Sequence, residues 1–150
     1  MYEKLSNRNF VDFNKEILFG EVGALISAPA VSYFAAMITK DYNVISLSAV
    51  IGAIIGASIF WIAMRIYDKK RNKMSVKNVA KDIAYFTPAA FLISLILYYP
   101  TLFLVSHYLL VEGVRVLYSV ISSQVIAFLS FLIGVNAYRY VLAYRFGKVL

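Results

Sequence analysis

The chain has 150 residues, of which 61% are hydrophobic, and its mean hydropathy is +0.73. Its net charge is +7, and it contains no cysteine. Soluble domains carry roughly 45–50% apolar residues, so this excess argues against a water-soluble globular protein. The lack of cysteine excludes disulfides, thiolate chemistry and cysteine-ligated metals.

The apolar residues come in runs of about twenty, the length that a helix needs to cross a hydrocarbon core of about 30 Å. A polar segment, 1–15, comes first, and Phe10 and Phe13 suit it to an interfacial helix. The first run has no small-residue cleavage site after it, so we interpret it as a retained helix and not a signal peptide. We predict a single all-α transmembrane domain over 1–150, with spans at 17–39, 44–64, 83–110 and 114–138.

The loop between the second and third spans, 65–82, holds seven of the fifteen Lys and Arg residues. With four spans, this loop shares one side with the two terminal segments, and that side carries thirteen positive residues. The other side has only Lys40 and Arg115. The positive-inside rule therefore predicts a multi-pass protein of the cell membrane, built as two helical hairpins with both termini cytoplasmic. Apolar spans flank the basic loop, so its expected partner is anionic lipid headgroups and not nucleic acid.

Small residues recur at every fourth position in the first two spans. In lipid, such smooth ridges allow close backbone approach, which drives helix association through van der Waals contact. We favour packing of the two spans against each other, and the alternative is that one ridge faces a partner protein. The candidate packing residues are Gly20, Ala24, Ala28, Ser48, Gly52 and Gly56, and a second ridge of Ala49, Ala53 and Ala57 runs beside the last three.

The third span is bulky and aromatic, and Tyr98-Tyr99-Pro100 lies near its middle. Proline interrupts the helical hydrogen-bond ladder and kinks a membrane helix. Buried tyrosine hydroxyls need hydrogen-bond partners. We favour a kinked packing helix whose tyrosines bond to other helices. The alternative is that Tyr98 and Tyr99 contact a lipid, an isoprenoid chain or a neighbouring subunit.

Glu21 is the one charged residue in the interior of a predicted span, because Arg115 lies at the very start of the fourth. Such residues are costly in the membrane and mark candidate functional sites. Two interpretations are open: stabilisation by the dipole near a helix amino-terminus, or an ion pair with Arg65 or Arg139.

Gln124 and Asn136 place amides in the fourth span, twelve residues apart and so roughly on one helix face. We expect this face to point into the protein and to bond across helices.

No paired carboxylates, Ser–His pair or glycine-rich loop is present, and a lone His107 cannot build a metal site by itself. We therefore expect no enzyme, no cofactor and no metal.

The hairpin, basic loop and second hairpin resemble the GtrA-like family of small four-span proteins. The most specific part is Phe131-Leu-Ile-Gly-Val-Asn136-Ala-Tyr-Arg139, which is similar to the final helix of that family, with its Asn and Arg followed by an aromatic residue. The resemblance implies the handling of sugars linked to polyprenyl phosphate, with Arg65 and Arg139 as phosphate contacts.

Two functions remain open. The first expectation is a non-catalytic accessory subunit of a larger membrane complex, such as a respiratory or copper-oxidase-type assembly, with other integral membrane subunits as partners. Its support is the smooth ridges, the aromatic third span and the lack of catalytic chemistry. The alternative is a GtrA-like carrier of lipid-linked sugars.

Overall fold

The computed structural model describes residues 7–72 and 90–146, and every element in these ranges is helical. The elements are α1 (Asn7–Ile38), α2 (Tyr42–Asn72), the π-helix η1 (Ser94–Tyr98), α4 (Tyr99–Val111) and α5 (Val116–Phe146). A helical turn, 90–93, leads into η1.

Four stretches of these helices are long and apolar enough to cross a membrane: Ile17–Ile38, Tyr42–Met64, Ala90–Val111 and Val116–Tyr138. Each has 22 or 23 residues, which at 1.5 Å per residue gives roughly 33 Å. The prediction of an all-α membrane protein with four spans is confirmed. The first part of the predicted third span, 83–89, lies outside the described residues.

A short turn joins the two helices of each hairpin. Asp41 caps α2, because its Oδ1 accepts a hydrogen bond of 2.9 Å from the Asn43 N–H. Gly113 ends α4 with a φ of +81°. The Gly113 N–H donates to the Leu110 carbonyl and the Val114 N–H to the Leu109 carbonyl, which is the double bond pattern of a Schellman motif. Both turns fall where the sequence predicted them.

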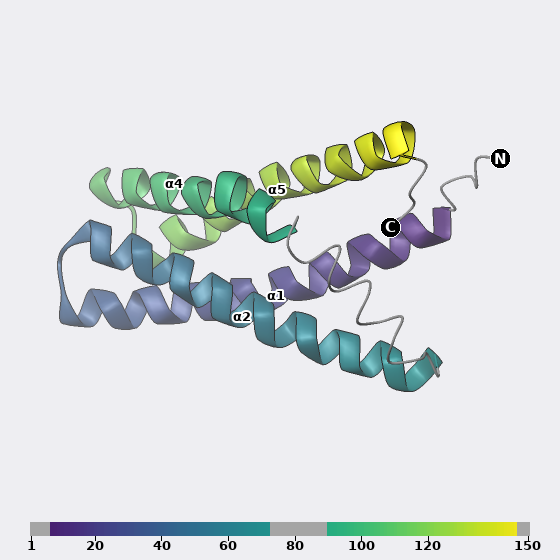
Figure 1. Ribbon diagram of the computed structural model, residues 1–150. Helices are drawn as coiled ribbons and strands as arrows, with labels where there is room; N and C mark the ends of the chain where they lie inside the picture. The colour runs from purple at the N-terminus through teal and green to yellow at the C-terminus, as the bar shows by residue number, and fades with distance from the viewer. Residues whose placement is uncertain (1–6, 73–89, 147–150) are drawn as a thin grey trace.

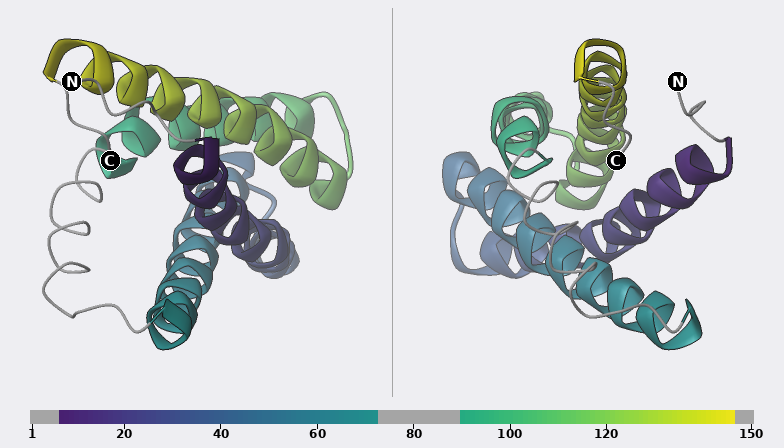
Figure 2. Two further views of the ribbon diagram at one scale, coloured as in Figure 1. Left: turned by 90° about the vertical axis from the view of Figure 1, so that its right-hand side faces the viewer. Right: turned by 45° about the vertical axis from the view of Figure 1, so that its right-hand side comes forward.

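Figure 1 shows both hairpin turns at one end of the molecule. The start of α1 and the ends of α2 and α5 lie at the other end, which we call the open end, because α2 and α5 diverge towards it (Figures 1 and 2). In this arrangement the chain would cross a membrane four times, in alternating directions. Which end faces the cytoplasm remains a prediction from the charges.

The closest helix pair is α1 and α2, and small residues make this contact possible. A Cβ atom added at Gly52 would lie 2.8 Å from the Ala28 Cα, and one added at Gly56 would overlap Gly23 and Ser27. The Ser27 hydroxyl lies 2.7 Å from the carbonyl oxygens of Gly23 and Gly52, so it can donate across the interface.

The second small-residue ridge of α2 faces the other hairpin. Ala49 and Ala53 are buried in a core with Tyr98, Leu102 and Val120. Both ridges of α2 therefore pack within the chain. This arrangement leaves α2 between α1 on one side and the second hairpin on the other.

Candidate functional site

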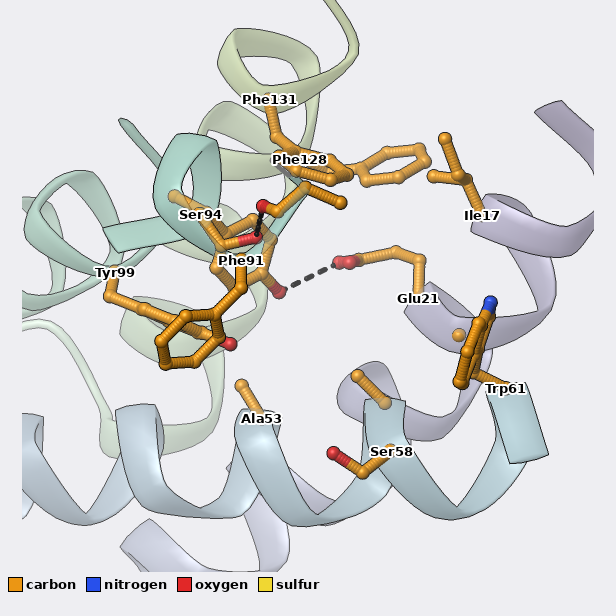
Figure 3. Close-up of a pocket in the computed structure, with 14 residues that line it drawn as sticks. Ile17, Glu21, Ala53, Ser58, Trp61, Phe91, Ser94, Tyr99, Phe128 and Phe131 are labelled. Carbon is orange, nitrogen blue, oxygen red and sulfur yellow. Dashed lines mark hydrogen bonds between the residues drawn. The ribbon is translucent and has the colours of Figure 1, made fainter. Parts of the chain in front are cut away.

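A cavity of about 200 Å³ lies between the two hairpins, and helices from both contribute to its wall. The first hairpin supplies Ile17, Gly20, Glu21, Ala53, Ala57, Ser58 and Trp61. The second hairpin supplies Ala90, Phe91, Ser94, Tyr98, Tyr99, Phe128 and Phe131. Figure 3 shows Glu21 extending into this space from α1, with Trp61 on the same side of the view and Phe128 and Phe131 above.

The π-helix η1 shapes one wall of the cavity. Pro100 has no N–H, so the Ile96 carbonyl has no partner of the usual α-helical kind. The chain widens just before the proline, and the Tyr99 N–H donates to the Ser94 carbonyl, five residues back. A wider turn rotates less per residue than an α-helix, which lets the consecutive Tyr98 and Tyr99 side chains both line the cavity. Such π-bulges occur frequently at functional sites.

Glu21 is the only Asp, Glu, Lys or Arg within the four spans. Only 8% of its surface is exposed. Its Oε1 accepts a hydrogen bond of 3.2 Å from the Tyr98 hydroxyl, across the gap between the hairpins (Figure 3). A buried carboxylate needs hydrogen bonds or a cation, and Tyr98 supplies one hydrogen bond.

The structure corrects one interpretation of Glu21. The helix dipole favours a carboxylate only within the first turn, whereas α1 begins at Asn7 and places Glu21 about four turns inside. The proposed ion pair with Arg65 or Arg139 lies outside the described residues, because the structure describes neither arginine side chain.

Aromatic rings surround the Glu21–Tyr98 pair. The Tyr98 ring meets Tyr99 edge to face, with centroids 5.4 Å apart, and meets Phe131 in the same way at 6.2 Å. Edge-to-face pairs are a favourable arrangement of aromatic rings. These contacts fix the Tyr98 hydroxyl where it can reach the carboxylate, so the cavity wall is preformed.

The amides of α5 differ in their surroundings. Gln124 is completely buried, and neither of its amide atoms has a hydrogen-bond partner within the described chain, although the Tyr98 hydroxyl is close enough to interact with it electrostatically. The Asn136 amide nitrogen donates 2.8 Å to the Leu132 carbonyl of its own helix. The serines also donate locally, Ser123 to the Ser119 carbonyl within α5 and Ser119 to the Arg115 carbonyl just before the helix.

The candidate packing residues divide into two groups. Gly52, Gly56, Ala24 and Ala28 are buried in the contact between α1 and α2 or in the adjoining core. Gly20 lies at the cavity with room for a Cβ atom, 3.6 Å from the Ala57 carbonyl oxygen.

Ser48 is only half-buried, and its hydroxyl donates to the Val44 carbonyl of its own helix. In the part of the chain that the structure describes, no group of three or more His, Asp and Glu residues is placed to hold a metal ion.

Two residues that are important to this arrangement were not predicted from the sequence. Gly23 approaches the Gly56 carbonyl and the Phe60 ring, and its spacing of four from Ser27 is a small-residue signal that could have identified it. Trp61 is the one tryptophan in the chain and lines the cavity. A tryptophan near the end of a membrane span is typical of the membrane interface, so its place in the sequence gives no signal for a cavity.

No family model matches this chain, and comparisons with curated proteins and with solved structures also find no match. The GtrA-like resemblance therefore stays a prediction.

Proposed function

We propose that the protein is a non-catalytic membrane protein that binds a small, largely hydrophobic ligand in the cavity between its hairpins and carries or presents it within the bilayer. The observation that carries the proposal is the preformed cavity of about 200 Å³, in which buried Glu21 and Tyr98 meet among aromatic rings. Ligand sites in proteins are commonly apolar cavities with a few fixed polar groups. A chain that acted only as packing surface would have no need for a buried carboxylate at such a place.

The proposed setting is the cell membrane, with both termini and the open end of the molecule in or near the cytoplasm. The support is the excess of Lys and Arg in the terminal segments and the basic loop. In this orientation the cavity lies in the cytoplasmic half of the bilayer, and Arg65 and the basic loop favour anionic lipids on that side.

A GtrA-like carrier is one form of this proposal. A polyprenyl chain could enter the apolar cavity, but its phosphate would be repelled by Glu21 there. The phosphate would instead lie at headgroup level with Arg65 and Arg139, and arginine suits phosphate through its planar, bidentate donors. Substitution of both arginines tests this form separately.

The accessory-subunit function remains the second candidate, and one observation favours it. The span Ala90–Val111 is the least buried of the four within the chain. It exposes large side chains such as Phe91, Ile96, Leu104 and Tyr108. These side chains could pack against the helices of a partner subunit as well as against lipid.

Native mass spectrometry of the wild-type protein, purified from its own membrane in mild detergent, separates the two candidates. The ligand proposal predicts the monomer mass plus a small, defined adduct that collisional activation releases. Stoichiometric association with a second polypeptide, without an adduct, would favour the accessory subunit and contradict the ligand proposal.

A further inference from the structure

We propose that the ligand of the cavity is a small hydrophobic organic cation, such as an aromatic or alkylated ammonium. This inference rests on the function proposed above and names the chemical class of the ligand. It follows from the combination of one buried carboxylate with a wall of aromatic rings.

The charge of the cavity selects a positive ligand. Among the described residues that line it, Glu21 is the only acidic or basic one, and its carboxyl group points into the space between the hairpins (Figure 3). The Tyr98 hydroxyl gives Glu21 one hydrogen bond, and no described Lys or Arg forms an ion pair with it. A bound cation would supply a counter-charge to the Glu21 carboxylate in a region where water is scarce.

The aromatic rings strengthen this selection. A cation is attracted to the face of Trp, Tyr or Phe within about 6 Å of the ring centroid, and sites for quaternary ammonium groups commonly use several such rings. Six rings from both hairpins line this cavity: Trp61, Phe91, Tyr98, Tyr99, Phe128 and Phe131. Neutral apolar ligands do not require a carboxylate at this position, and anions are disfavoured by it.

The size of the cavity limits the ligand. An engineered apolar cavity of about 150 Å³ holds benzene, so about 200 Å³ accommodates one ring or a short branched ammonium. Phe91 at the wall is 52% exposed and Ser58 is also exposed. The cavity is therefore open on this side, and a ligand can enter from the surrounding bilayer.

The test compares benzylammonium with ethylbenzene, its neutral isostere, in which a methyl group replaces the charged ammonium group. Binding to the full chain in lipid nanodiscs is measured by equilibrium dialysis, with empty nanodiscs to subtract partitioning. Trp61 is the only tryptophan, so a saturable change in its fluorescence locates the ligand at the cavity. We expect the cation to bind at least tenfold more tightly than its isostere.

Glu21→Gln keeps the size of the side chain and an oxygen that can accept the Tyr98 hydrogen bond, but it removes the charge. We expect it to weaken binding of the cation at least tenfold. Glu112→Gln, which removes a carboxylate in the turn between α4 and α5, is the matched control and should bind like the wild type. If Glu21→Gln does not fold, the charge of the ligand is tested only by comparing the cation with its isostere on the wild-type protein.

Equal affinity for the two probes, or unchanged cation affinity in folded Glu21→Gln, would overturn the cation assignment and leave the ligand function intact. Failure of both probes to bind would also overturn it. The proposed function is decided separately, because native mass spectrometry detects an adduct of any charge.

Discussion

The Tyr98 hydroxyl donates a hydrogen bond of 3.2 Å to the Glu21 carboxylate, although the two residues are 77 positions apart in the sequence. Glu21 belongs to the first hairpin and Tyr98 to the second, so this bond joins the two halves of the molecule across the cavity. It is both a structural link and the polar centre of the proposed ligand site.

A double-mutant cycle measures this link. Tyr98→Phe removes the donor and Glu21→Ala removes the acceptor, so each should lower the stability of the protein. The pair should show a coupling energy of about 0.5–1.5 kcal/mol, as expected for a hydrogen bond between membrane helices. The measurement is reversible unfolding in detergent of the wild type, both single variants and the double variant. Strict additivity of the two changes would show that the bond contributes nothing.

The glycine contacts predict different responses to the same small substitution. Gly56→Ala places a methyl group against Gly23 and Ser27, where no room exists, so we expect a loss of about 1–3 kcal/mol. Gly56→Leu should be worse. Gly20→Ala is the matched control, because its Cβ atom would make only ordinary contacts. Thermal unfolding in detergent gives the comparison, and equal stability of the two alanine variants would contradict the packing of α1 against α2.

The chain contains no cysteine, so single introduced cysteines can report the topology without background labelling. Single cysteines at Asp41 and Glu112 lie in the two hairpin turns, and one at Asn72 lies at the end of α2. In intact cells, a membrane-impermeant maleimide should label the two turn positions and spare Asn72→Cys until the cells are opened. The reverse pattern would contradict the cytoplasmic placement of the termini.

The sequence predicted the spans well and the site only in part. Long apolar runs and the turn residues Asp41 and Gly113 determine where membrane helices begin and end, because lipid leaves the backbone few alternatives. Glu21 and Tyr98 were recognised individually, one by its charge and the other by its place before a proline. Their pairing depends on how four helices rotate about their axes, and on the π-turn before Pro100. Neither the helix rotations nor the π-turn can be read from the spacing of residues in the sequence.

Arg65→Gln combined with Arg139→Gln tests the lipid-linked-sugar form of the proposal. The described wall of the cavity consists of other residues, so we expect the double variant to fold and to keep its small-molecule adduct in native mass spectrometry. Transfer of a sugar linked to polyprenyl phosphate, assayed in membrane vesicles, should fall only if the phosphate binds these residues. Loss of transfer by the folded double variant would favour the GtrA-like carrier over the cation ligand.

The accessory-subunit candidate makes an opposing prediction at the exposed face of the third span. Ile96 and Leu104 are well exposed, at 70% and 63%, and neither lines the cavity. If the protein acts through its cavity, Ile96→Ala with Leu104→Ala should leave both the adduct and the apparent mass in mild detergent unchanged. A smaller complex in size-exclusion chromatography would indicate that this face binds a partner subunit.

The most direct test of the central claim fills the cavity and measures whether the ligand is lost. Ala57→Phe adds a ring at the cavity wall, and Ile59→Phe adds one at an exposed position two residues away. Ser58→Phe serves as a second filling variant at a more open part of the wall. In native mass spectrometry of the purified full-length proteins, we predict that the adduct persists in the wild type and in Ile59→Phe and disappears from the folded filling variants. An adduct of unchanged mass and occupancy in all four proteins would show that the cavity between the hairpins is not the binding site.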